Sequence, residues 1–401
     1  MIPALRQHFN AAFTEARYAA LLAELNTAVY CPVDFRVAET PLFLDAETAR
    51  RLAQAARDIV TQLATPEFRK HAASAIPEGL IVPAETRFPH FLCIDFALCE
   101  DGFGRVEPQL IELQAFPTVA CFQTLLTRAY PRHFDIPANF TSYFGGLDEE
   151  SYLTLLRRAI VGGCDPRETV LLEITPDQQK TRVDFAATDK LLGIRPVDVS
   201  AVRKRGKQLF YDRDSVETPI KRIYNRVIFD ELLRKKPAMA FSFFDDLDVQ
   251  WAGHPNWYFR ISKHTLPFLK GACVPYCRLV SDPAALPTDL ENCVLKPLYS
   301  FAGVGVDITP TREKIAAIPN PREWLLQRKV AYAPLLATPD GPAKAEVRLI
   351  LAGDGTDWPR LMNKLVRLSK GAMHGVDFNK GRTWVGASAG FHPAGSGTTP
   401  P

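Results

Sequence analysis

The spacing of hydrophobic residues divides the chain into segments of different predicted structure. Residues 1–30 and 46–63 place their apolar side chains at helical intervals, and Asp45 stands where it can cap the second helix. Around residues 80–115 the spacing changes to the alternation that is typical of strands. The strands predicted there are 79–82, 91–98 and 109–114, and a helix is predicted at 119–129.

From residue 150 onward, predicted helices and strands alternate. The run 169–174 is almost continuously apolar, as expected of a strand that is buried on both faces of a parallel sheet. The predicted helices are 150–161, 178–192 and 227–234, and the predicted strands are 169–174, 193–199 and 220–224. This order indicates a small doubly wound unit of about a hundred residues. Strands are expected again at 292–308, 324–331, 345–352 and 363–369.

Composition narrows the classes of protein to which the chain can belong. Its 401 residues, 47% of them hydrophobic, can bury a large core. This length is typical of two or three domains or of one multi-lobed enzyme. The 48 Lys and Arg residues against 45 Asp and Glu leave a formal charge of +3, which is too small for a nucleic-acid-binding surface.

Cysteine usage and the N-terminal segment bear on location. The eight cysteines are scattered, form no CxxC pair and have no histidine cluster at zinc spacing, which favours free thiols in a reducing compartment. The N-terminal segment carries charges throughout, unlike a signal peptide, and no stretch is long and apolar enough to span a membrane. We therefore expect a cytoplasmic protein without membrane or nucleic-acid partners, of unspecified oligomeric state.

Candidate metal ligands occur on two of the predicted strands. Glu112 and Gln114 are two residues apart, so both point to the same face of a strand. Asp95, on the preceding strand, reaches the same place if the two strands pair. Carboxylate and amide oxygens suit a hard cation such as Mg²⁺. The alternative is that these residues are only the solvent-facing side of an edge strand.

A lysine and a loop of small residues near residue 300 are typical of a phosphate-binding element. Lys296 ends an apolar run, and a second run follows at 306–308, so two strands joined by a flexible loop are expected. Glycine lets backbone N–H groups approach an anion closely, and lysine adds a point charge. Similar hairpins are also common without any ligand, so both readings stay open from the residues alone.

Further basic residues lie in the C-terminal half of the chain. Lys263 follows an aromatic run; a lysine there usually extends to solvent, but with Lys296 it would hold different phosphates of one nucleotide. Residues 324–332 are expected to form a strand and an extended link that could offer backbone groups to an adenine edge. Arg348 and Arg367 fall within strands, where arginine is either paired structurally or stabilises negative charge in a cleft.

The chain lacks a recognisable nucleophilic centre. No Ser/His/Asp set and no thiol with a nearby base occurs at a known spacing. His374 lies in a glycine-interrupted segment, expected to be a loop at the edge of a cleft, and is interpreted as structural or substrate-contacting. Any catalysis would therefore depend on charged groups that bind and orient the reactants.

In their order along the chain, these motifs resemble those of the ATP-grasp ligases, specifically the circularly permuted kind related to glutathionylspermidine synthetase. That family binds Mg²⁺ early in the chain through an acidic residue and a Glu-x-Asn followed by a proline-containing loop, which Asp95 and Glu112-Leu-Gln114 match. Two nucleotide-binding lysines come later, as Lys263 and Lys296 do. In ordinary ATP-grasp enzymes the Glu-x-Asn lies after the lysines, so the order here points to permutation.

The resemblance spans residues 80–391 and assigns the remaining motifs. A Rossmann-like pre-grasp segment is similar to the stretch 165–235, and a late family arginine corresponds to Arg367. The nucleotide-binding residues that it implies are Lys263, Lys296, Ser300, Ala302, Gly303, Gly305, Gln327, Lys329 and Val330. The implied metal ligands are Asp95, Glu112 and Gln114, and the implied catalytic charges are Lys296, Arg348 and Arg367.

The chain also departs from the family pattern. Gln114 replaces the usual Asn, which keeps an amide oxygen on a longer side chain, and the loop near residue 300 is poorer in glycine. Cys93 stands two residues before Asp95, where the synthetase has an arginine that helps to neutralise the reacting phosphate. One of three arginines, Arg87, Arg348 or Arg367, is expected to supply the missing charge, and the sequence leaves open which.

The resemblance implies an α/β (α+β) protein with a circularly permuted ATP-grasp fold and a Rossmann-like pre-grasp subdomain. The expected parts are a helical segment (1–80), a metal-carboxylate part (81–148), the Rossmann-like subdomain (149–250), a lysine and phosphate-loop part (251–391) and a flexible tail (392–401). The implied function is an ATP- and Mg²⁺-dependent ligase that joins a small-molecule carboxylate to an amine through an acyl phosphate. The alternatives are a phosphotransferase and a non-catalytic nucleotide-binding protein.

Overall fold

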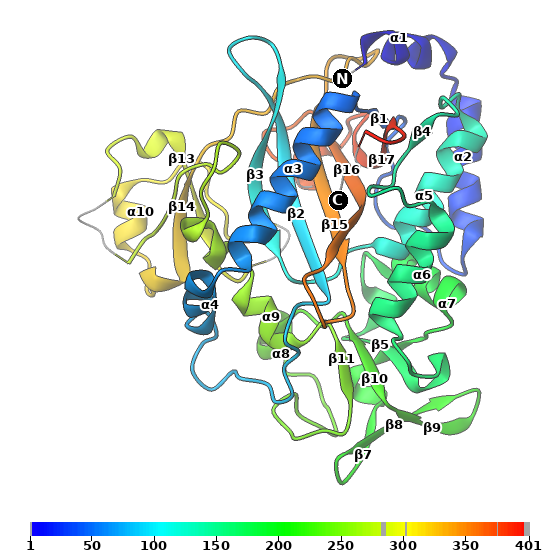
Figure 1. The fold of residues 1–401 in the computed structure, drawn as a ribbon, viewed down its shortest axis with the longest axis vertical. Helices are drawn as coiled ribbons and strands as arrows, with labels where there is room; N and C mark the ends of the chain where they lie inside the picture. The colour runs from blue at the N-terminus through cyan, green and yellow to red at the C-terminus, as the bar shows by residue number, and fades with distance from the viewer. Residues whose placement is uncertain (1, 282–285, 301–302, 375, 397–401) are drawn as a thin grey trace.

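A large mixed sheet forms the centre of the fold (Figure 1). The computed structural model describes residues 2–281, 286–300, 303–374 and 376–396. In this part of the chain the sheet has seven strands in the order β1-β17-β16-β15-β2-β3, with β4 paired to β17. Their bounds are β1 (Leu42–Phe43), β2 (Phe91–Glu100), β3 (Val106–Gln114), β4 (Phe140–Thr141), β15 (Lys344–Ala352), β16 (Arg360–Ser369) and β17 (Gly386–Pro393). Because β2 pairs with β15, early and late parts of the chain build one sheet.

One face of this sheet is apolar and is covered by helix α3 (Ala46–Leu63), which crosses β2 and β3 in Figure 1. The helical spacing of apolar residues places Ile59 in the same buried core as Ile94 of the sheet. Asp45 accepts a hydrogen bond of 2.7 Å from the Thr48 N–H, so the predicted helix cap is confirmed. Since side chains alternate along a strand, the residues between the apolar ones point to the opposite face.

Helices gather at one side of the sheet, at the right of Figure 1. They are α2 (Glu15–Ala28), α5 (Ala120–His133), α6 (Glu149–Ile160) and α7 (Arg182–Leu192). The helical segment expected at 1–30 is two helices, α1 (Pro3–Ala12) and α2. The chain is extended at Phe13 and Thr14, and the Thr14 side chain accepts a hydrogen bond from the Arg17 N–H at the start of α2.

A second, four-stranded sheet has the order β11-β10-β5-β6, and all of its pairs are parallel. This confirms the parallel pairing that the apolar run 169–174 predicts. The strands are β5 (Thr169–Glu173), β6 (Pro196–Asp198), β10 (Arg222–Asn225) and β11 (Gln250–Ala252). Helix α8 (Phe229–Lys235) lies between β10 and β11 in the chain. A separate hairpin sheet projects at the bottom of Figure 1 and consists of β7 (Arg203–Arg205), β8 (Gln208–Arg213) and β9 (Val216–Ile220).

A three-stranded antiparallel sheet lies beside β3, at the left of Figure 1. Its order is β12-β14-β13, with β12 (Cys277–Leu279), β13 (Cys293–Pro297) and β14 (Trp324–Arg328). The neighbouring helices are α4 (Pro66–Ala73), α9 (Pro255–Arg260), η4 (Lys263–Phe268) and α10 (Arg312–Ala316). The remaining short 3-10 helices are η1 (Pro166–Glu168), η2 (Pro176–Gln178), η3 (Val199–Ala201), η6 (Leu290–Asn292), η7 (Pro321–Glu323) and η8 (Val376–Asn379).

Two predicted strands are wrong in detail. Residues 79–82 form no strand, because the main chain of Val82 exchanges hydrogen bonds with the side-chain amide of Asn256, at 2.9 and 3.0 Å, instead of with a neighbouring strand. The run 306–308 contributes only an isolated bridge between Leu295 and Asp307. At the C-terminus, strand β17 continues to Pro393, past the boundary expected at residue 392.

Among the described residues, no helix has both the length and the hydrophobicity that crossing a membrane requires. All eight cysteines are free thiols.

Candidate active site

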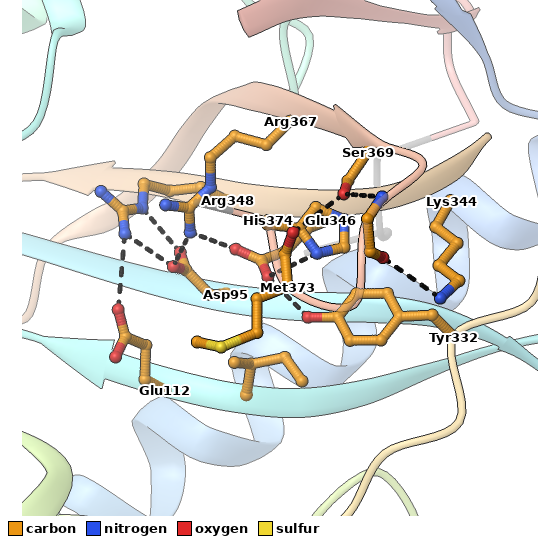
Figure 2. Close-up of polar contacts among 12 residues, drawn as sticks. Asp95, Glu112, Tyr332, Lys344, Glu346, Arg348, Arg367, Ser369, Met373 and His374 are labelled. Carbon is orange, nitrogen blue, oxygen red and sulfur yellow. Dashed lines mark hydrogen bonds and ion pairs between the residues drawn. The ribbon is translucent and has the colours of Figure 1, made fainter. Parts of the chain in front are cut away.

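Charged side chains from four neighbouring strands meet on the face of the large sheet that α3 does not cover (Figure 2). Asp95 of β2 lies directly opposite Glu112 of β3 on one side and Arg348 of β15 on the other. Glu346, two residues before Arg348, lies opposite Arg367 of β16. The two-residue period of a strand therefore brings all five side chains to one face.

Two arginines engage the carboxylate of Asp95, which is only 1% exposed. Arg348 donates from Nε to Oδ1 and from Nη2 to Oδ2, each at 2.6 Å, and Arg367 donates to Oδ2 at 2.6 Å. Burial raises the pKa of Asp95, and the two guanidinium groups act against this rise. Bidentate pairs of this kind fix both partners in position.

Two lysines approach the same region from outside the large sheet. Lys263 of η4 lies 3.5 Å from Glu112 and donates to the main-chain oxygen of Ser300. Lys296 of β13 donates to the main-chain oxygen of Ile111, at 3.1 Å, and to the side chain of Gln327. Burial lowers the pKa of Lys296. Burial alone would raise the pKa of Glu112, but Lys263 and the arginines lower it.

A small cavity opens between these groups. Glu112 and Gln114 contribute to it from β3, and Lys263 and Ser300 contribute from the opposite side. The other lining residues are Leu113, Tyr258, Ser262, Leu298 and Tyr299. The structure thus brings together residues predicted as metal ligands and residues predicted to bind phosphate.

Within the described part of the chain, three buried polar atoms of this region have no hydrogen-bond partner: Ser300 Oγ, which belongs to the cavity wall, and Arg367 Nε and His374 Nε2 of the neighbouring charged cluster. An unsatisfied buried polar group is costly, so these atoms favour a polar ligand such as a phosphate group. Downstream of Ser300, Gly303 and Gly305 both have a φ of 76°, which favours glycine. Ala302, predicted to contact phosphate, lies outside the described residues.

The residues of the predicted adenine-binding link differ in their burial and in their contacts. Gln327 is buried and donates from Nε2 to the main-chain oxygen of Leu110 at 3.0 Å, so it lies inside the cluster. Lys329 is exposed, and its main-chain N–H donates to Asn292 O at 2.8 Å. Val330 is half-buried.

Tyr332, Glu346 and His374 extend the site along the sheet (Figure 2). The sequence reasoning did not assign Tyr332 or Glu346 to the site, and it interpreted His374 as structural or substrate-contacting. Tyr332 donates to Glu346 at 2.6 Å, Arg367 forms an ion pair with the same carboxylate, and His374 Nδ1 lies 3.9 Å from it. Burial alone would raise the pKa of Glu346, but Arg367, His374 and Tyr332 lower it to about 2. The spacing of two residues between Glu346 and Arg348 was the available signal, because it places both on one strand face.

The residues fit a magnesium ion only in part. Among the described residues, no group of three His, Cys, Asp or Glu side chains is arranged to hold a metal ion. Both oxygens of Asp95 are engaged by Arg348. Glu112 and Gln114 line the cavity and offer oxygen atoms of the kind that Mg²⁺ prefers, provided that a ligand such as phosphate supplies the other positions.

Comparison with known proteins gives a relation at the level of fold. No protein-family model and no curated protein sequence matches this chain. Among solved structures, the chain is similar to a glutathione synthetase-like effector from Globodera pallida in its apo form, with a TM-score of 0.52 and 10% sequence identity. The match covers 90% of this chain and 95% of that chain. The chain therefore has a mixed α/β fold similar to that of a glutathione synthetase-like protein.

Proposed function

We propose that the chain is an ATP-dependent carboxylate–amine ligase on a circularly permuted ATP-grasp fold. The observation that carries the proposal is the cavity that Glu112, Gln114, Lys263 and Ser300 line. Lys296 and Gln327 hydrogen-bond to each other and to the main chain of β3, the strand that carries Glu112. These residues come from four separate segments, in the order that the family resemblance expects. The fold-level similarity to a glutathione synthetase-like structure supports the same class of protein.

Each group has a role in this proposal. Lys263 and Lys296 would bind the phosphates of ATP. Gly303 and Gly305, both with a φ of 76°, would let main-chain N–H groups come close to those phosphates. Arg367, bound to Asp95 and Glu346, would present its free Nε–H to developing negative charge. ATP would supply the phosphoryl group, and Mg²⁺ held with Glu112 would offset phosphate charge.

The reaction that this arrangement supports has two steps. An oxygen of the carboxylate substrate takes the γ-phosphoryl group, and ADP leaves. The amine nitrogen then bonds to the carbonyl carbon as the carbon–oxygen bond to phosphate breaks, and the amine loses a proton. Such chemistry depends on orientation and charge rather than on a nucleophilic side chain, consistent with the absence of a recognisable triad in the sequence.

ADP release tests the proposal, measured with a panel of small carboxylates and amines. We expect release that requires both substrates and that is lost in Lys296→Met and Glu112→Gln. Lys207→Met and Glu217→Gln, on the separate hairpin sheet, are matched controls with the same changes of side chain and should keep full activity. Undiminished turnover in both site variants would refute the assignment.

A second candidate is a nucleotide-binding protein without catalysis. The engagement of both Asp95 oxygens by Arg348 favours it, since it removes a predicted metal ligand. This candidate predicts nucleotide binding without Mg²⁺-dependent ADP formation. A phosphotransferase would instead form ADP without any amine. For either enzyme, small-molecule substrates and a cytoplasmic location remain our expectation.

A further inference from the structure

Three hydrogen bonds from guanidinium groups already hold the buried carboxylate of Asp95. Its Oδ1 accepts from Arg348, and its Oδ2 accepts from both Arg348 and Arg367, all at 2.6 Å, while the side chain is enclosed by the sheet. A divalent cation binds a carboxylate through an oxygen with an open approach. A metal ion at Asp95 would therefore have to displace a guanidinium group from a bidentate contact.

The balance of charge leads to the same conclusion. The three carboxylates on this face, those of Asp95, Glu112 and Glu346, are each within 4 Å of a cationic side chain. The cations are Arg348, Arg367 and Lys263. Lys296, which also acts electrostatically on Glu112, is a fourth positive group. With four positive groups against three negative ones, no uncompensated negative charge remains around Asp95 to attract a divalent ion.

The carboxylate of Glu112, unlike that of Asp95, is not held in close contact with a cationic side chain. Its nearest cationic atoms, Lys263 Nζ at 3.5 Å and Arg348 Nη2 at 3.7 Å, are beyond normal charge-assisted hydrogen-bond distance. It also lines the cavity together with Gln114, whose amide oxygen is two residues away on the same strand face. One cation position therefore remains, on β3.

We propose that Arg348 takes the place of one metal ion, so that the site accepts a single divalent cation, on Glu112 and Gln114, with each bound nucleotide. The inference rests on the proposed nucleotide site. It also fits the residue at position 93: the Cys93 thiol donates to a main-chain oxygen of Phe116, and Arg348 on the paired strand β15 would supply the positive charge that β2 lacks.

Counting bound Mn²⁺ tests this inference without knowledge of the substrates. The full chain is dialysed to equilibrium with Mn²⁺ and the non-hydrolysable analogue adenylyl imidodiphosphate, with the analogue below the protein concentration. Bound Mn²⁺ is then measured per bound analogue. We expect one Mn²⁺ in the parent and in Arg348→Lys, and two in Arg348→Ala, where the Asp95 carboxylate becomes accessible. Circular dichroism verifies that each variant is folded.

Asp95→Asn and Glu112→Gln separate the two carboxylates. We expect Asp95→Asn to keep one Mn²⁺ per analogue and Glu112→Gln to lose it. Two Mn²⁺ in the parent, or loss of Mn²⁺ in Asp95→Asn, would overturn the inference while leaving the nucleotide site intact. Failure of the parent to bind the analogue at all would instead refute the proposed function and the inference with it.

Discussion

Glu346 offers a sharp test of the charged network, because its ionised form depends on its neighbours. The side chain is buried, accepts a hydrogen bond from Tyr332 and forms an ion pair with Arg367. Replacing it with glutamine keeps the shape and the acceptor for Tyr332 but removes the charge. Arg367 then keeps only Asp95 as its carboxylate partner. We expect Glu346→Gln to destabilise the fold at neutral pH.

The size of the effect follows from the pKa. Neighbouring groups lower the pKa of Glu346 from 4.5 to about 2, in spite of its burial. Because one pKa unit corresponds to about 1.4 kcal/mol, the ionised carboxylate contributes about 3 kcal/mol to stability. A carboxyl group whose folded pKa is lowered contributes above its unfolded pKa, and this contribution is lost as the pH falls from 4.5 toward 2.

The contribution of Glu346 is measured as the difference in free energy of unfolding between the parent and Glu346→Gln. Unfolding in urea is monitored by tryptophan fluorescence at a series of pH values from 7 to 2.5. We expect a difference of about 3 kcal/mol at pH 7 that shrinks steadily below pH 4.5. Glu217→Gln, which breaks an exposed ion pair on the hairpin sheet, should show little difference at any pH. A difference between parent and Glu346→Gln that does not change with pH would refute the reasoning.

Three further predictions concern the lysines and the loop. Lys296→Met should weaken binding of an ATP analogue by roughly 10- to 150-fold in calorimetry, as expected for a lost charged hydrogen bond, whereas Lys207→Met should not. Gly305→Ala should weaken the same binding by about tenfold, because φ at Gly305 is 76° and an added Cβ would lie 3.0 Å from the ring of Pro297. The control Gly102→Ala adds a Cβ in open space and should have no effect. Burial lowers the pKa of Lys364 well below its ordinary value, so the folded state binds fewer protons. Thermal melting should show the parent gaining stability relative to Lys364→Met as the pH rises from 7 to 10; a flat difference would contradict this.

The strand patterns predict much of the site from the sequence. Glu112 and Gln114 are two residues apart on a strand, and that spacing places both in the cavity. Asp95 was expected beside them if β2 and β3 pair, and they do. These are consequences of a local period of two, which the sequence carries directly.

The partners of Asp95 could not be predicted in the same way. Arg348 reaches it because β15 pairs with β2, a contact between distant parts of the chain that no local pattern encodes. The position of Lys263 in a 3-10 helix and the pairing of Val82 with Asn256 are likewise tertiary effects. The sequence identified Arg348 as either paired or catalytic, and only the structure shows both of its contacts to Asp95.

A crystal structure with Mg²⁺ and adenylyl imidodiphosphate tests the central claim most directly. We predict that the phosphates lie between the large sheet and the three-stranded sheet β12-β14-β13. Their oxygen atoms should be within about 3 Å of both Lys263 Nζ and Lys296 Nζ. Glu112 should face the phosphates through the cation. Phosphate density elsewhere on the molecule, or a nucleotide bound without contact to either lysine, would contradict the account.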